Sequence, residues 1–179
     1  MKAGIGIDPG NQFGLAVVSV EAEPRLLHWF SDKLGLKRSK LPSFWVRAAI
    51  TAVDTDSESR ITITRAVIED QYLPRGPRAN IDTAIKIGRN SGRWQEACEV
   101  HGISVEFIKP ASWQHAQLKG LLPNGARSTS KQRKVAAVAF CRGAWGEVLS
   151  EDAADAACMA RVVAVRLFRD DCQVKSTVK

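Results

Sequence analysis

The first thirty residues constrain the fold of this chain more than any other segment. Residues 3–7 form a short apolar run that ends at Asp8-Pro9-Gly10, where proline fixes the backbone φ angle and glycine permits a sharp turn. The β-branched and apolar stretch at 13–20 predicts a second strand, and 25–31 predicts a third. We therefore expect a meander of three strands, with Asp8 at the end of the first.

Helices and single strands alternate after the meander. The predicted helices cover 44–53, 80–100, 131–142 and a long segment that begins at Ser150 as its N-cap, and further strands are predicted at 61–68 and 103–108. Gly88 and Gly92 share one face of the second helix and are expected to let another helix approach closely, either at a dimer contact or by packing within one subunit. This order predicts an α/β fold: a mixed sheet, in which a three-stranded antiparallel meander is extended by parallel strands, flanked by helices.

The length and composition of the chain are those of one globular domain. Its 179 residues, 45% of them hydrophobic, are sufficient to bury a sizeable core, and no linker divides them. We expect one domain over residues 1–169 and a flexible tail over 170–179, where apolar residues are few. No apolar run approaches the roughly 20 residues of a membrane span, and Asp8 interrupts any secretory segment, so we expect a cytoplasmic protein.

Other residue types that often carry chemistry give weaker signals here. The four cysteines lack CxxC spacing and are expected to be reduced thiols, which gives zinc and redox roles little support. The five tryptophans lie mostly in apolar surroundings and are expected to be core or interface anchors: Trp29, Trp45, Trp94, Trp113 and Trp145.

Positive charge is concentrated in two segments. The formal net charge is +7, and residues 107–146 contain no acidic residue but seven basic ones. Residues 71–93 hold five basic residues against Asp82 alone. This distribution favours a polyanionic partner such as nucleic acid, although a solvated surface selected for solubility would have the same pattern.

Four carboxylates occupy positions from which they can converge. Asp8 and Glu69 each end a predicted strand, and parallel pairing of those strands places both ends at one edge of the sheet. Asp152 and Asp155 are three residues apart near a helix start and share a face that can meet that edge. Without a counter-ion the four groups would repel one another, and a pair of divalent cations removes that repulsion.

The ligand type indicates which cations suit such a cluster. Oxygen ligands without nearby His or Cys favour magnesium, with manganese as a substitute, over zinc or copper. Two such ions about 4 Å apart activate a water and stabilise the leaving oxygen of a phosphodiester. Taken singly, each carboxylate is better explained as a turn residue, a solvated strand end or a complement to the helix dipole, and only their joint order favours a metal site.

At these motifs the sequence resembles the RuvC family of Holliday-junction resolvases, within the ribonuclease H-like superfamily. The resemblance extends to about residue 168 and rests on four motifs: Gly6-Ile7-Asp8-Pro9-Gly10 with Gly14, Ile68-Glu69-Asp70-Gln71-Tyr72, Lys86-Ile87-Gly88 with Gly92, and Asp152-Ala153-Ala154-Asp155-Ala156. It implies that Asp8, Glu69, Asp152 and Asp155 hold two Mg²⁺ ions. It also implies a homodimer of bacterial or phage origin that cuts opposed strands of a four-way junction, leaving a 5′-phosphate and a 3′-hydroxyl.

The resemblance extends to residues that would contact DNA. Tyr72 is expected to stack on unpaired bases, where the family usually has Phe, and Lys131 to contact the scissile phosphate as a catalytic lysine. Further phosphate contacts are expected from Arg75, Arg78, Lys119, Arg127, Arg133 and Lys134. The loop at 73–79 is longer than the usual connection, so the details of junction recognition do not carry over directly.

Three other functions are compatible with parts of this pattern. A ribonuclease H-like nuclease acting on RNA–DNA hybrids or other branched DNA would use the same carboxylates. A catalytically inactive junction-binding protein would need only the basic segments. A sugar or acetate kinase-like ATPase shares the Asp-x-Gly turn, but it requires a second phosphate loop and a longer chain than this one.

Overall fold

The computed structural model describes residues 1–10, 12–33, 41–55, 61–71, 81–122 and 128–177. Its strands are β1 (Lys2–Asp8), β2 (Gln12–Ser19), β3 (Leu26–Lys33), β4 (Thr62–Glu69) and β5 (Ser104–Ile108). Its helices are α1 (Pro42–Thr55), α2 (Ile81–Glu99), α3 (Pro110–Leu118), α4 (Ser130–Trp145) and α5 (Glu151–Thr177). All of the strands and helices predicted from the sequence are present, with shifts of a few residues at most of their ends.

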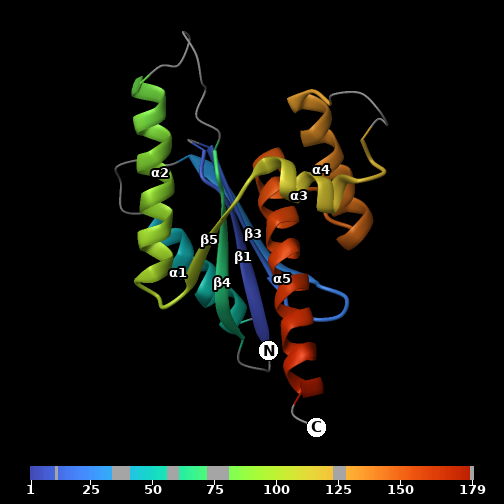
Figure 1. The fold of residues 1–179 in the computed structure, drawn as a ribbon. Helices are drawn as coiled ribbons and strands as arrows, with labels where there is room; N and C mark the ends of the chain where they lie inside the picture. The colour runs from blue at the N-terminus through green and yellow to red at the C-terminus, as the bar shows by residue number, and fades with distance from the viewer. Residues whose placement is uncertain (11, 34–40, 56–60, 72–80, 123–127, 178–179) are drawn as a thin grey trace.

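The five strands form one mixed sheet in the order β3-β2-β1-β4-β5. Strands β1, β2 and β3 pair antiparallel, and β4 and β5 extend the sheet in parallel from β1. This arrangement confirms the predicted fold class. Because Ile7 pairs with Ile68 in the parallel ladder, the carboxyl ends of β1 and β4 lie at the same edge, near the start of α5 (Figure 1).

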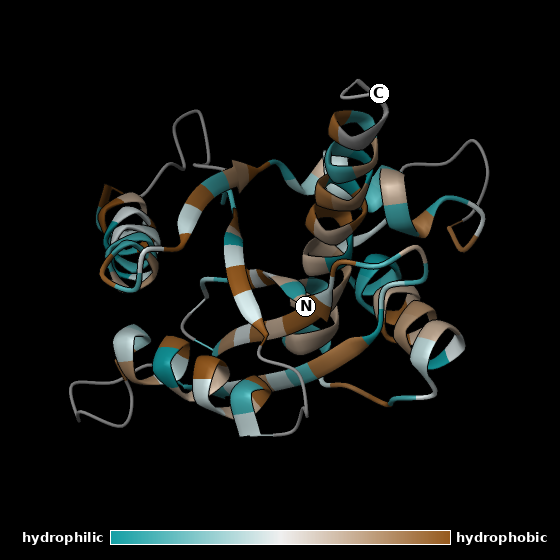
Figure 2. Ribbon diagram, turned by 90° about the horizontal axis from the view of Figure 1, so that it is seen from below, coloured by the Kyte–Doolittle hydropathy of each residue, from teal (hydrophilic) through white to brown (hydrophobic). Residues whose placement is uncertain are grey.

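Side chains along the strands alternate between the two faces of the sheet, and each face packs against its own layer of helices. Ile5, Ile7 and Leu15 belong to the core beneath α1 and α2, whereas Ala16 and Val67 belong to the core beneath α3, α4 and α5. Figure 2 shows helices on either side of the sheet, with the helix that ends at the C-terminus on one side. Side chains two residues apart on a strand point to the same face, so Glu69 lies on the face of Val67. Asp8 follows Ile7 directly and therefore lies on the opposite face from it. Both carboxylates are thus on the α5 side of the sheet.

Two glycines allow α5 to lie directly against the sheet. A Cβ atom at Gly14 would overlap the carbonyl oxygen of Asp152, and one at Gly6 would overlap that of Ala156. The alanine-rich face of α5 presents equally small side chains, including the buried Ala153 and Ala160. The start of α5 is therefore held close to the ends of β1 and β2.

The structure differs from the sequence prediction at three places. Helix α3 was not predicted, although Pro110 in its first turn is a common helix-start residue. The backbone of α5 is helical through residue 177, where a flexible tail from residue 170 was expected, and Lys2 pairs with Asp171 at 2.7 Å there. Gly88 and Gly92 have no described atom within 4 Å of their Cβ positions, so the packing within one subunit that was one of two interpretations of this face is not found among the described residues.

Among the described helices, none combines the length and the apolar content that crossing a membrane requires.

Candidate active site

The four carboxylates singled out in the sequence line a single pocket. The pocket has a volume of about 330 Å³ and lies at the carboxyl ends of β1 and β4, against the first turns of α5. Its lining residues are Asp8, Gly10, Gln12, Glu69, Gln71, Pro110, Gln114, Ser130, Arg133, Lys134, Asp152 and Asp155. Side chains from the beginning, middle and end of the chain are thus brought together, as the sequence predicted.

Each carboxylate is placed by the local structure that carries it. Asp8 pairs with Gly14 in the antiparallel ladder and is 8% exposed, on the face of the sheet that α5 covers. Glu69 pairs with Ile108 on the neighbouring strand β5. Asp152 and Asp155 are separated by three residues in the first turns of α5, so both point from one face of the helix.

Burial and mutual repulsion make these groups difficult to ionise together. Desolvation, followed by the charges of Glu69 and Asp152, raises the pKa of Asp8 to about 7. Desolvation and the charges of Asp8 and Glu69 raise the pKa of Asp155 to about 8. Desolvation also raises the pKa of Glu69, against the opposing effect of a hydrogen bond from Trp113. The pocket therefore favours a positive charge at its centre.

The donor set suits a hard divalent cation. Every acidic group at the pocket offers oxygen, and Oδ1 of Asp155 is buried without a hydrogen-bond partner. Within the described ranges, no three acidic, His or Cys side chains are already gathered at the distances of a formed metal centre. The carboxylates line the walls of an open pocket, and a divalent cation would supply the partner that the buried Oδ1 of Asp155 does not have among the described residues.

Lys134 is the cationic side chain that pairs with a carboxylate of this pocket. Its Nζ atom lies 2.9 Å from Oδ1 of Asp152 and 3.4 Å from Oε2 of Glu151. Burial alone would lower the pKa of Lys134, but the hydrogen bond and charge of Asp152 raise it above its ordinary value. Lys134 is therefore charged and partly neutralises the carboxylate cluster.

Lys134 lines the pocket, where the sequence analysis had expected Lys131. A capping box between Thr129 and Gln132 fixes the start of α4. In this orientation Lys131 is exposed and is not among the residues that line the pocket, whereas Ser130, Arg133 and Lys134 are. The lysine at the candidate site is thus one turn later than the sequence suggested.

The remaining predicted DNA contacts are placed only in part. The Arg133 guanidinium donates a hydrogen bond to the carbonyl of Ser128 at the edge of the pocket. Lys119 is exposed just after α3 and does not line the pocket. Tyr72, Arg75, Arg78 and Arg127, with the loop at 73–79, lie outside the described residues.

Two side chains that hydrogen-bond to carboxylates of the site were not identified from the sequence. The indole Nε1 of Trp113 donates to Oε1 of Glu69 at 2.9 Å, although Trp113 was expected to be only a core or interface anchor. Gln71 Nε2 lies 3.5 Å from Oδ1 of Asp8. Gln71 belongs to the motif at the end of the strand that carries Glu69, so its place in the sequence could have identified it as a residue of the site. No comparable signal marked Trp113, because its helix was not predicted.

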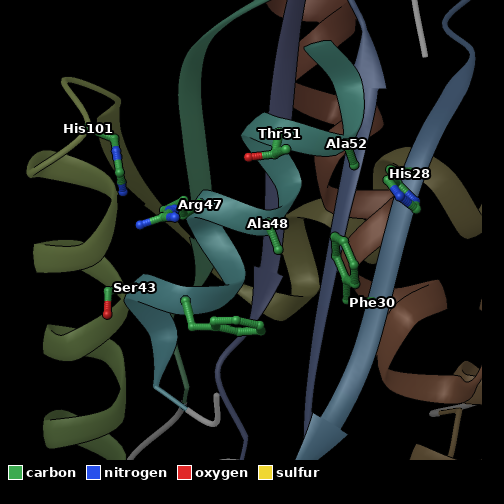
Figure 3. A pocket seen from close by; sticks show the side chains of 9 residues that line it. His28, Phe30, Ser43, Arg47, Ala48, Thr51, Ala52 and His101 are labelled. Atoms are coloured by element: carbon green, nitrogen blue, oxygen red, sulfur yellow. The ribbon is translucent and has the colours of Figure 1, made fainter. Parts of the chain in front are cut away.

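A larger hollow lies elsewhere, between α1 and β3 and near the turn that precedes β5 (Figure 3). Its volume is about 960 Å³, and it is lined by His28, Phe30, Ser43, Phe44, Arg47, Ala48, Thr51, Ala52 and His101. It contains none of the acidic residues predicted for the site. The candidate active site is therefore the smaller pocket.

The sheet order, the two helical layers and the position of the pocket define a ribonuclease H-like α/β fold. Among solved structures, the chain is similar to RuvC of Thermus thermophilus in complex with a Holliday junction substrate, with 22% identity and a TM-score of 0.63. That match covers 94% of this chain and 96% of the other. A second T. thermophilus RuvC structure gives 24% identity and a TM-score of 0.58 over 88% of this chain and 90% of the other.

These similarities confirm at the level of the fold the resemblance to RuvC that the sequence motifs indicated. The sequence matches no protein-family model and no curated protein.

Proposed function

We propose that the protein is a divalent-metal-dependent endonuclease that resolves four-way (Holliday) DNA junctions by paired phosphodiester hydrolysis. The observation that carries this proposal is the gathering of Asp8, Glu69, Asp152 and Asp155 around one pocket. The RuvC-like fold adds support, since one of the similar structures is described with a Holliday junction substrate. The basic side chains at the pocket rim suit a phosphodiester substrate.

The four carboxylates are the groups that would hold the metal. Bound Mg²⁺, or Mn²⁺ in its place, supplies Lewis acidity for activating water and for stabilising the leaving 3′-oxygen, which gives 5′-phosphate and 3′-hydroxyl ends. Lys134 pairs with Asp152, and its ammonium group would attract the scissile phosphate. Arg133 and Ser130, from the first turn of α4, offer further donors to the phosphate backbone.

A panel of substrates tests the proposal against its alternatives. The purified protein is incubated with four-way junctions, forks, linear duplexes and RNA–DNA hybrids, with and without Mg²⁺. We expect paired, symmetric nicks in the four-way junction that require the metal. Preferential cleavage of the hybrid would support a ribonuclease H-like activity instead. Junction binding without cleavage under any divalent cation would support an inactive binding protein.

Replacing Lys134 is expected to reduce cleavage more than replacing Lys131. Lys134→Met removes the positive charge beside Asp152, so single-turnover junction cleavage should fall by roughly 100-fold, as for the loss of one preorganised electrostatic contact. Lys131→Met removes an exposed charge of the same helix and should change the rate by less than about threefold. Equal losses in the two variants would contradict the assignment of Lys134 to the site.

The proposed paired cleavage requires two active sites, and α2 offers a surface for a second subunit. Ile81 is 74% exposed and Ile85 is 45% exposed on this helix. Gly88 and Gly92 continue the same face, with open space above them. A stripe of two isoleucines and two glycines lets a second α2 approach closely. We therefore propose that this stripe is the contact between the two subunits of a homodimer.

Ile85→Asp is expected to convert the dimer into a monomer, because it places a charge at the centre of the α2 stripe. Analytical ultracentrifugation should then give the mass of one chain, and bilateral cuts in the junction should become independent single nicks. Val174→Asp, at a position 65% exposed on α5, provides the control and should remain dimeric. An Ile85→Asp protein that stays dimeric would exclude this face as the contact.

A further inference from the structure

The carboxylate of Glu69 is held by a side chain from outside its own strand. Trp113 donates its indole N–H to Oε1 of Glu69 at a distance of 2.9 Å. The ring of Trp113 is fully buried in the core beneath α3, α4 and α5, whereas Glu69 lines the pocket. The hydrogen bond therefore connects the packed core to one wall of the candidate active site.

The backbone makes this contact a rigid one. Glu69 ends β4 and pairs with Ile108, the last residue of β5. The chain then passes through Lys109 into α3, which begins at Pro110 and carries Trp113 in its first turn. Only four residues separate Trp113 from Ile108, which pairs with Glu69, so the indole is fixed relative to the carboxylate by the sheet and by a proline-started helix.

Burial of the Trp113 indole does not by itself explain why its N–H contacts Glu69. Trp45 and Trp94 have buried Nε1 atoms with no hydrogen-bond partner. The fold thus tolerates indole N–H groups without acceptors, while the N–H of Trp113 is directed at a carboxylate of the pocket. A charge-assisted hydrogen bond away from water is also stronger and more directional than a neutral one.

We propose that Trp113 is a positioning residue that orients Glu69 for metal binding. Its N–H occupies Oε1 and restricts rotation of the carboxylate, so that Oε2 is presented to the cation. Partners of this kind, which hold a metal ligand in place, typically change metal affinity by roughly 10- to 100-fold when they are removed. The inference rests on the proposed metal-dependent function but concerns a contact that can be tested without DNA.

Trp113→Phe removes the N–H and keeps an aromatic ring in the core. Isothermal titration of the DNA-free protein with Mn²⁺ is expected to show an affinity roughly tenfold or more below that of the wild type. The Mg²⁺ concentration for half-maximal junction cleavage should rise by a similar factor, while the rate at saturating Mg²⁺ falls by less. Trp94→Phe is the matched control, because it makes the same change at a fully buried tryptophan whose N–H has no partner.

Two further variants separate orientation of Glu69 from a general effect on packing. Benzothienylalanine at position 113 replaces the N–H by sulfur in a ring of the same shape, and it should reproduce the loss of Mn²⁺ affinity even where Trp113→Phe fails to fold. In a Glu69→Gln background, Trp113→Phe should lower the remaining Mn²⁺ affinity by less than about twofold, because the two changes act through one ligand.

Wild-type Mn²⁺ affinity in both Trp113 variants, or equal losses in Trp113→Phe and Trp94→Phe, would overturn the positioning role. A wild-type protein that binds no Mn²⁺ would overturn it together with the metal site. Reduced Mn²⁺ affinity in the Trp113 variants of a protein that cleaves no junction would support the positioning role and contradict only the proposed substrate.

Discussion

Asp155→Asn is expected to abolish junction cleavage and, at the same time, to raise the melting temperature of the metal-free protein at pH 8. The carboxylate is one of the four at the pocket, and its buried Oδ1 has no hydrogen-bond partner. Loss of a metal ligand should reduce cleavage by about a thousandfold or more. Loss of a buried negative charge beside three others should stabilise the fold when no cation is bound.

The pH dependence of stability follows from the direction of the pKa shifts. The folded state raises the pKa of Asp8 from 3.8 to about 7 and that of Asp155 from 3.8 to about 8. Folded protein therefore holds more protons than unfolded protein between these values, and the stabilisation is complete below about pH 4. It is lost as the pH rises through 7 to 8, unless a divalent cation binds.

Thermal melts between pH 4 and pH 9, with and without Mg²⁺, measure both effects. The wild type should lose stability across this range without metal and recover it with Mg²⁺ at pH 8, whereas Asp155→Asn should show a smaller loss and a smaller recovery. Asp171→Asn on the same helix, whose carboxylate pairs with Lys2 at the surface, is the control and should cleave normally. Substantial cleavage by Asp155→Asn, or a lower melting temperature at pH 8, would contradict the role given to Asp155.

Gly14→Ala is expected to cause the second large effect. The added methyl group would overlap the carbonyl oxygen of Asp152, which is backbone and cannot rotate away. The start of α5 must then move away from β2, at a cost of about 3 kcal/mol in the free energy of unfolding. A displacement of roughly 1 Å at the carboxylates of α5 should lower the cleavage rate by about 100-fold in the molecules that remain folded.

Chemical denaturation and single-turnover cleavage measure these two consequences separately. Gly143→Ala in α4 is the matched control, because a Cβ at that position meets no described atom within 4 Å. It should leave cleavage unchanged and stabilise the helix by about 0.5–1 kcal/mol. If Gly14→Ala retains wild-type stability and activity, the close contact between α5 and β2 does not position the site.

The fold and the acidic pocket were largely predictable because they depend on local patterns. Asp8 and Glu69 end apolar strands, and the parallel pairing of β1 with β4 places these two ends together. The spacing of Asp152 and Asp155 fixes a shared face as soon as α5 is helical. These are consequences of strand and helix geometry that do not require knowledge of packing.

The lysine at the site could not be selected from the sequence, because helix rotation decides it. Apolar residues of α4 occur on more than one of its faces: Ala136 and Ala137 are buried, yet Val135 is 59% exposed. Such a pattern does not define one inward face, so periodicity alone does not distinguish the position of Lys131 from that of Lys134. The capping box at Thr129 and the ion pair between Lys134 and Asp152 determine which of them lies at the pocket.

Helix α3 escaped prediction for a related reason. It has nine residues, and only Trp113 and Leu118 among them are buried. Two apolar positions are too few to establish a helical period, and the short helix is stabilised chiefly by tertiary contacts. The hydrogen bond from Trp113 to Glu69 joins two elements distant in sequence, so no local pattern could indicate it.

We propose that four carboxylates, from β1, β4 and the first turns of α5, form one divalent-metal site. Anomalous diffraction from crystals grown with Mn²⁺ tests it most directly. We expect two Mn²⁺ peaks about 4 Å apart in the pocket, ligated by Asp8, Glu69, Asp152 and Asp155. A pocket without Mn²⁺ at millimolar concentrations, or Mn²⁺ bound only elsewhere on the protein, would contradict it.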